Sequence, residues 1–244
     1  MIELAMEIPK SLLNDLSPLC DFEFCLAQET DDEEYAAFYK TAVEKIGRTC
    51  IMDNGFHELG RPLSCLELFA AANKVNPTYV IAPDMLDDLK WTFAEWKKCK
   101  HVFRESKTKV IPVLVDAPEL DQKSFILNVD GDVLCLPFRR PRLEWYRFHR
   151  GEIRKKFSHV HLLGINTLDE LEAFSQLGYE DGIRFTVDSS KPVKWGLLKQ
   201  RLINLDSVRG APIHSSSLIG VENVSQEQLG TISWNVAYLR RFLG

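Results

Sequence analysis

The sequence predicts an α/β protein, and within that class a minimal (β/α)8 TIM-like barrel formed by a single domain over residues 1–244. Three observations lead to this prediction. Short apolar runs alternate with amphipathic segments at intervals of about 25 to 30 residues, which is the order of βαβ units in a parallel sheet. The apolar runs are nearly continuous, as expected for strands with both faces covered. The length of 244 residues also suits a barrel of about 250 residues.

Seven apolar runs are predicted as strands, and an eighth is considered after them. Each run is rich in β-branched or other apolar residues, which favour strands. The predicted strands are 22–28, 49–53, 78–84, 109–116, 132–138, 159–165 and 182–188, and the eighth candidate is 201–208. Helical periodicity marks the segments between them and the end of the chain, namely 32–47, 64–75, 86–103, 142–157, 167–178 and 227–243.

Two segments are less regular. Residues 118–132 are too short for an ordinary barrel helix, and their Asp-Gly pair could instead turn a small hairpin. After Asp188 the chain is irregular until the final helix. A doubly wound open sheet is the alternative architecture, but no GxGxxG follows the first predicted strand, so its nucleotide-binding version is weakly supported.

Composition excludes some classes of protein. No apolar run reaches the roughly 18 residues of a membrane span, and the N-terminus lacks the features of a signal peptide. The six cysteines have no metal-ligand spacing, so they are expected to be reduced, mostly buried thiols of a cytoplasmic protein. A net charge of -5 argues against non-specific coating of nucleic acid, although it allows a local basic patch.

Four predicted strands end in aspartate: Asp53, Asp84, Asp116 and Asp188. In a barrel, chemistry takes place at the carboxyl ends of the strands. Each aspartate alone is explained as well by a helix cap or a turn, but four on one rim indicate a site. Such carboxylates could bind Mg²⁺ or Mn²⁺, act on a glycosidic bond, or accept hydrogen bonds from a guanine-like base.

Order and spacing favour the glycosidic reading. The segments MDNGFHELG (52–60), VIAPDMLDD (80–88) and VIPVLVDAP (110–118) are followed by HLLGINTLDELEAFSQLGYEDGIRFTVDSS (161–190). In this order they resemble the (T/S)DSGG(F/Y)Q, guanine-reading, GIVQG and YLMGVG segments of the tRNA-guanine transglycosylase superfamily. The last is the most specific match, because its strand, glycine, acidic helix and strand-terminal aspartate are all in register.

The resemblance implies a role for each matching residue. Asp188 corresponds to the nucleophile, and Asp53 to the general acid/base that protonates the departing guanine or deprotonates the incoming base. The implied base-binding residues are Asp84, Phe56, Asp116, His57 and Gly164. For Phe56 a place in the core is an equal alternative, and His57 alone suits a polar rim position.

The chain also departs from the family pattern. The DSGG segment is one glycine shorter, the GIVQG glutamine is replaced by Asp116, and CLPFRRPR (135–142) replaces the GGLAVGE strand. The CxCxxC zinc motif and its insertion, which help other members to dock tRNA, are absent. With these features the chain most resembles the compact phage relatives that place a 7-deazaguanine in DNA.

A basic stretch, residues 139–157, follows the fifth predicted strand and has eight Lys or Arg against two Glu. It is either a solvated amphipathic helix or a groove for the phosphate backbone. On the second reading its loop arginines contact phosphates, and two lysines after Asp188 assist. The candidates for nucleic-acid binding are Arg139, Arg140, Arg142, Lys191 and Lys194.

The function expected from these observations is exchange of guanine for a 7-deazaguanine derivative in DNA through a covalent glycosyl-aspartate. No metal or organic cofactor is expected, the partners are a nucleic acid and a free 7-deazaguanine base, and no membrane is involved. The expected location is the cytoplasm, or the host cytoplasm for a phage protein. The alternatives are a tRNA-guanine transglycosylase, a hydrolase of 7-deazaguanine nucleosides, a non-catalytic binding module and a metal-dependent phosphohydrolase.

Overall fold

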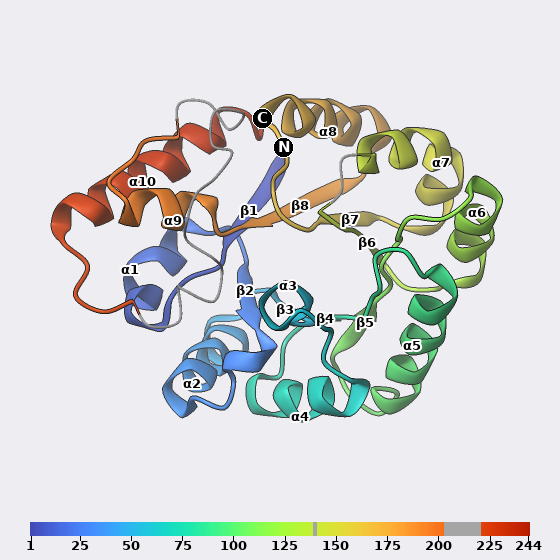
Figure 1. Ribbon diagram of the computed structural model, residues 1–244, viewed down its shortest axis with the longest axis horizontal. Coiled ribbons are helices and arrows are strands. Elements are labelled where there is room, and N and C mark those ends of the chain that lie inside the picture. Colours follow the sequence, from blue (N-terminus) through green and yellow to red (C-terminus); the bar gives the residue numbers. More distant parts are fainter. Residues whose placement is uncertain (139–140, 203–220) are drawn as a thin grey trace.

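The computed structural model describes residues 1–138, 141–202 and 221–244. Within them the chain is a mixed α/β protein whose strands form two four-stranded parallel sheets, in the orders β1-β8-β7-β6 and β2-β3-β4-β5. Helices lie around the outside of the strands (Figure 1). The strands are β1 (Ile2–Met6), β2 (Glu23–Leu26), β3 (Cys50–Asp53), β4 (Tyr79–Ile81), β5 (Lys109–Ile111), β6 (Val133–Leu136), β7 (His159–Leu162) and β8 (Arg184–Ser189).

Helices connect successive strands, as the parallel order of each sheet requires. The α-helices are α1 (Leu13–Leu16), α2 (Glu33–Thr41), α3 (Phe56–Leu59), α4 (Cys65–Val75), α5 (Leu89–Val102), α6 (Glu119–Asn128), α7 (Arg142–Lys156), α8 (Leu168–Asp181), α9 (Lys191–Leu197) and α10 (Gln226–Arg240). Short helical turns are η1 (Lys10–Leu12), η2 (Ser17–Leu19), η3 (Ala27–Glu29) and η4 (Ala42–Ile46).

A few hydrogen bonds join the two sheets at their edges. Beyond β5, Val113 forms an isolated parallel bridge with Cys135, and the Leu114 amide donates to the Cys135 carbonyl at 3.0 Å. On the other side, the Asp21 amide donates to the Leu4 carbonyl at 2.8 Å, and the Leu4 amide donates to Asp21 Oδ2 at 2.8 Å. The carboxyl ends of strands from both sheets therefore lie at one end of the molecule.

The strand prediction missed the first strand of the chain. Ile2–Met6 forms β1, which the sequence analysis did not recognise, and it pairs with β8 in a register that places Ala5 beside Asp188. Its partner β8 (Arg184–Ser189) is distant in the sequence, so no local pattern reveals the pairing. Most of the eighth candidate strand, 201–208, lies outside the described residues.

Within residues 118–132, Glu119–Asn128 forms a helix, and no hairpin is found there. Pro118 precedes α6, and three side chains at helical spacing are buried: Gln122, Phe125 and Ile126. The helix connects β5 to β6, and the parallel bridge between Val113 and Cys135 shows that these two segments run in the same direction. Three turns of helix are sufficient here because the strands it joins are themselves short.

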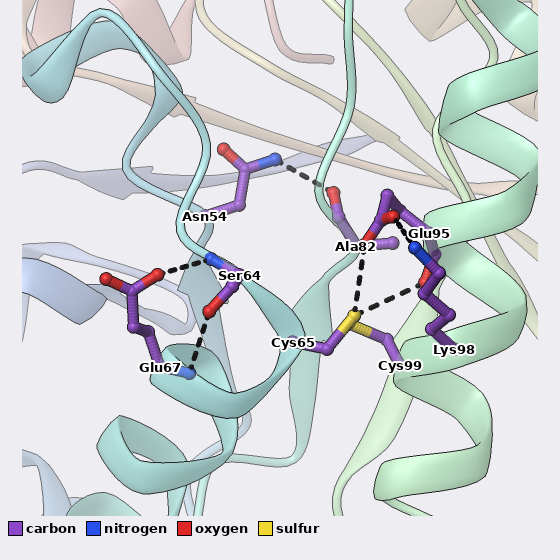
Figure 2. The surroundings of a disulfide bond; sticks show 8 residues. All are labelled: Asn54, Ser64, Cys65, Glu67, Ala82, Glu95, Lys98 and Cys99. Carbon is purple, nitrogen blue, oxygen red and sulfur yellow. Dashed lines mark hydrogen bonds and ion pairs between the residues drawn. A yellow bond between two sulfur atoms is a disulfide. The ribbon is translucent and has the colours of Figure 1, made fainter.

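The expectation of reduced cysteines was wrong for two of the six. Cys65 at the start of α4 and Cys99 in α5 form a disulfide bond, with Cα atoms 4.9 Å apart (Figure 2). They are 34 positions apart in sequence, so only the packing of the two helices brings them together. The other four cysteines are free and buried. Among the described residues, no helix is long and apolar enough to cross a membrane.

Candidate active site

A pocket of about 390 Å³ opens at the carboxyl ends of the strands, between the two sheets. Its size lies within the range of small-molecule sites. It is lined by Asp53 of β3 and by Asp84, which follows β4, together with Gly164, which follows β7, and Asp188 of β8. All three aspartates are buried, with exposed fractions of 3% to 8%.

The loop after β3 holds Asp53 at the pocket. Gly55 has φ of 76°, a left-handed conformation that favours glycine, and a Cβ there would approach Gln28 Oε1 to 3.1 Å. The Gly55 amide donates to Asp53 Oδ2 at 2.8 Å. Asp-Asn-Gly is therefore both the turn that closes β3 and the device that orients a pocket carboxylate.

Asn54 fixes the second carboxylate. Its side-chain amide donates to Asp84 Oδ1 at 2.7 Å and to the Ala82 carbonyl at 2.8 Å (Figure 2). Its Oδ1 accepts the Phe56 amide at 3.0 Å. Because the Asn54 side chain is saturated by these contacts, Asp84 cannot rotate without breaking a buried hydrogen bond.

Asp188 lies in β8 and contacts β7 through one of its oxygens. Oδ1 accepts the Gly164 amide at 3.2 Å and lies 3.2 Å from His161 Nε2. Among the described residues, no hydrogen bond to Oδ2 is found. Gly164 has φ of 62°, and a Cβ there would approach Phe138 to 2.9 Å, so glycine is required where the backbone contacts Asp188.

Burial and like charges raise the pKa of several carboxyl groups. The pKa of Asp53 is well above its ordinary value, mainly because of burial and then the charge of Glu58. Burial also raises the pKa of Asp84 to about 6, against the opposing effect of the Asn54 hydrogen bond. The pKa of Glu7 is raised by burial and by the charges of Asp188 and Glu58. Glu7, Asp53 and Asp84 therefore keep their protons to higher pH than free carboxyl groups do, and a protonated carboxyl group can donate a proton.

The pocket brings together most of the residues singled out from the sequence. Those that line it are Asp53, Phe56, His57, Asp84, Gly164, Asp188, Lys191 and Lys194. Lys191 Nζ donates to the Ile165 carbonyl and lies 5.6 Å from the Phe138 ring centroid. Burial lowers the pKa of Lys194, against the charges of Glu7 and Glu58. Both lysines thus lie at the pocket wall, and burial disfavours the charged form of Lys194.

Asp116 does not reach this pocket. β5 ends at Ile111, and the chain continues to an exposed Asp116 whose amide donates to the Leu86 carbonyl at 3.1 Å. Its carboxylate lines a separate hollow with Asp87 and Asp88. The structure therefore does not place Asp116 where it could contact a base in the pocket.

The expectation that Arg142 contacts phosphate was wrong, because this side chain is fully buried. Its guanidinium forms an ion pair with Glu170 at 2.6 Å and donates to the carbonyls of Leu163 at 2.6 Å and Gly164 at 2.8 Å. It therefore fixes the loop whose amide contacts Asp188. Arg139 and Arg140 lie outside the described residues.

The described part of the basic stretch is an amphipathic helix that packs on α8. Trp145, Tyr146 and His149 of α7 are buried. Arg150 Nε donates to Asp181 Oδ1 at 2.7 Å, and Tyr146 donates to Oδ2 of the same carboxylate at 2.6 Å. The solvated-helix interpretation therefore describes α7 better than an aromatic-lined groove.

The pocket residues that were missed from the sequence as parts of a site include Glu7, Asn54, Glu58 and Trp195. Glu7 follows β1, which was itself not recognised. Asn54 precedes a glycine, a pair that is typical of turns, so its sequence position gives no sign of a place in a site. Another residue that was missed, His161, lies below the pocket. It alternates with His159 in the apolar run HVHLLGI, and polar residues at alternate positions of a buried strand are a signal that could have been used.

No protein-family model matches the chain, and no curated protein matches it either. Among the described residues, no group of three or more His, Cys, Asp or Glu side chains is arranged to hold a metal ion.

Proposed function

We propose that the two sheets form a minimal (β/α)8 barrel and that the protein exchanges a guanine base in nucleic acid for a 7-deazaguanine. One observation carries this proposal: Asp188 and Asp53 line the same pocket from opposite sheets. Two carboxyl groups in different environments can act as nucleophile and as acid/base on one glycosidic bond. The motif order described above supports the choice of substrate.

In the first step, Asp188 attacks C1′ of the target nucleotide. A C1′–O bond forms, the C1′–N9 bond breaks, and the departing guanine takes the bond's electron pair. Asp53 supplies the proton that the guanine anion needs. The raised pKa of Asp53 suits this role, because a general acid must hold its proton near neutral pH.

In the second step, a free 7-deazaguanine occupies the same pocket. Asp53, now ionised, removes the proton from N9 of the incoming base. N9 then attacks C1′, and the ester bond to Asp188 breaks with the electron pair returning to the carboxylate. Two displacements at C1′ give retention, and both catalytic groups return to their initial state.

Asp84 and the apolar walls provide the base-binding surface. An ionised Asp84 can accept hydrogen bonds from N1–H and the exocyclic amine of guanine, while Asn54 occupies Oδ1. Phe56 and Phe138 also line the pocket and offer aromatic surface for a planar base. The lining also includes aliphatic side chains such as Leu26, Leu163 and Ile165, which contact a base without orienting it, so the polar contacts would define the base's orientation.

DNA is the proposed nucleic acid, and the support comes from the resemblance to the phage relatives and from the lack of a CxCxxC motif within this sequence. A base inside a duplex must first be flipped out or be presented in a single strand. Arg139 and Arg140 remain the candidates for phosphate contact, now without Arg142. Replacing either with alanine should reduce the slope of log affinity against log salt by about 0.9 per lost contact.

Exchange of labelled guanine into DNA and into unmodified tRNA, side by side, tests the function. We expect label in DNA with wild-type protein and with Asp130→Asn, a matched control in an exposed loop. Asp188→Asn and Asp53→Asn should incorporate none or little. Label in tRNA alone would support the tRNA alternative, and release of free base without exchange would support a hydrolase. No reaction with any nucleic acid, with Asp188→Ala retaining wild-type affinity, would support a binding module.

A further inference from the structure

A column of buried polar side chains lies beneath Asp188. His159 and His161 come from β7, and Thr186 comes from β8, where it pairs with His161 in the strand register. All three are at most 4% exposed. Alternate residues of a strand point to the same face, so this column shares a face of the sheet with Asp188.

The column is continuous in hydrogen-bonding distance. Thr186 Oγ1 lies 2.7 Å from His159 Nε2 and 2.8 Å from His161 Nδ1. The other nitrogen of His161, Nε2, lies 3.2 Å from Asp188 Oδ1. The ring is turned so that this contact falls outside hydrogen-bond geometry, and Nε2 has no other hydrogen-bond partner among the described residues. The His161 ring is held from its sides, stacked on Phe24 with centroids 5.8 Å apart and edge-on to Phe22 at 6.0 Å.

The single proton of the Thr186 hydroxyl gives this column a direction. If the hydroxyl donates to His159, His161 Nδ1 must carry a proton, and a neutral His161 then presents the lone pair of Nε2 to Asp188. Two lone pairs 3.2 Å apart repel when the carboxylate is ionised, as a nucleophile must be. If the hydroxyl donates to His161, the proton of His161 is on Nε2 and faces Asp188.

His159 is suited to the second arrangement. Its pKa is lowered to about 3, mainly by burial and then by the charges of His161 and Arg184, so it is neutral at ordinary pH. A neutral His159 can donate Nε2–H to the Thr186 oxygen. In this arrangement His159 donates to Thr186, Thr186 donates to His161, and His161 directs its Nε2–H towards Asp188.

We infer that His161 is a positioning residue that presents Nε2–H to Asp188 Oδ1, with its tautomer fixed by Thr186 and His159. Together with the Gly164 amide, it immobilises Oδ1 and leaves Oδ2 as the oxygen that attacks C1′. The tautomer is a property of the folded protein alone, whereas the role in attack rests on the proposed function.

Nitrogen NMR of ¹⁵N-histidine-labelled protein tests the tautomer without any substrate. The chain has six histidines, and the His161→Gln spectrum identifies the ring in question. We expect a neutral His161 protonated on Nε2 in the wild type, and a mixture of tautomers in Thr186→Val, which keeps the β-branched shape and removes the hydroxyl. A neutral ring protonated on Nδ1, or a doubly protonated ring, in the wild type would overturn the inference.

Single-turnover kinetics test the role in attack. His161→Gln keeps an N–H donor near Nε2, whereas His161→Met fills the space without one. We expect Met to slow formation of the covalent intermediate about 10- to 100-fold, the loss of one hydrogen bond to a charged group, with KM for the free base unchanged. Gln should recover most of the rate. Equal rates for the two variants would overturn the positioning role.

Thr186→Val should also slow the intermediate, and Thr108→Val serves as its matched control. Thr108 is a buried threonine whose hydroxyl donates to the Pro77 carbonyl at 2.8 Å, away from the pocket, so its variant should react at the wild-type rate. Circular dichroism confirms that each variant is folded. If the wild type shows no exchange, the proposed function fails, while the NMR result still decides the tautomer.

Discussion

Asp188 and Asp116 follow similar apolar runs in the sequence, yet only one of them lies in the pocket. β8 extends through Asp188 to Ser189, and Ala5 of β1 pairs beside it. β5 ends at Ile111, so Asp116 lies beyond the ladder and is exposed. An aspartate after an apolar run therefore belongs to the site only when the strand ladder, or another side chain, holds it there.

Asp84 shows the second way of holding a carboxylate. It also lies beyond the end of its strand, because β4 ends at Ile81. Its Oδ1 nevertheless accepts a hydrogen bond from Asn54 at 2.7 Å, which keeps it buried at the pocket. Asp116 has no comparable side-chain hydrogen bond among the described residues. Of the four strand-end aspartates, Asp53 and Asp188 lie within paired strands. Asp84 is held by the Asn54 side chain, and Asp116 lies outside the pocket.

The largest effect on exchange is expected at Asp188, which lies within β8. Asp188→Asn should lower the exchange rate by about 10⁴-fold or more, because an amide cannot form the glycosyl ester. The isosteric change should leave the free energy of unfolding close to that of the wild type. A measurement of exchange rate together with urea denaturation checks both parts. A folded Asp188→Asn protein with wild-type exchange would contradict the assignment of the nucleophile.

Arg142→Met tests the support behind that aspartate. This change leaves Glu170 buried without its partner, and removing one member of a buried ion pair costs about 3 to 5 kcal/mol. Denaturant titration should show the loss of stability. Arg150→Met, which removes a partly exposed arginine from the same helix, should cost less. Equal losses for the two variants would mean that the buried pair has no special role.

The effect of pH separates the aspartate held by Asn54 from the others. With a pKa of about 6, Asp84 is protonated below pH 6 and ionised above it. Because the ionised form accepts both donors of the guanine edge, affinity for the free base should rise about tenfold per pH unit up to pH 6 and then level off. Asp84→Asn should bind weakly and lose this inflection. An unchanged inflection in the variant would assign it to another group.

The smallest effect is expected at Asp116. Asp116→Asn should change the exchange rate and KM for the base by less than about twofold, as is usual for exposed positions away from a site. Steady-state kinetics beside the wild type check this. A large rise in KM would place Asp116 in contact with the base, and the distinction drawn here between the strand ends would fail.

The sequence alone predicts the parallel α/β class and the three buried aspartates of the pocket, because both depend on local patterns. Continuous apolar runs mark buried strands, and Asp53, Asp84 and Asp188 follow such runs directly. What it misses depends on partners that are distant in sequence. β1 pairs with β8, which is distant in the sequence. Cys65 meets Cys99 only after α4 and α5 pack.

Arg142 shows why charge patterns mislead. In the sequence it belongs to a basic stretch that suits phosphate binding, but Glu170, which neutralises it, lies on another helix. His161 was overlooked for a related reason. It is a polar residue inside an apolar run, and its contact with the site is apparent only when β8 places Thr186 and Asp188 beside it. In both cases the deciding neighbour comes from tertiary structure.

The central claim, that Asp188 forms a covalent bond with the sugar, is tested most directly by mass spectrometry of the acid-quenched protein. The protein is incubated with a guanine-containing oligonucleotide in the absence of a competing base, quenched, and digested. We expect the abasic sugar to be attached to the peptide that contains Asp188, and the adduct to disappear when a 7-deazaguanine is added before the quench. No adduct in a reaction that releases guanine, or an adduct on another residue, would contradict the account.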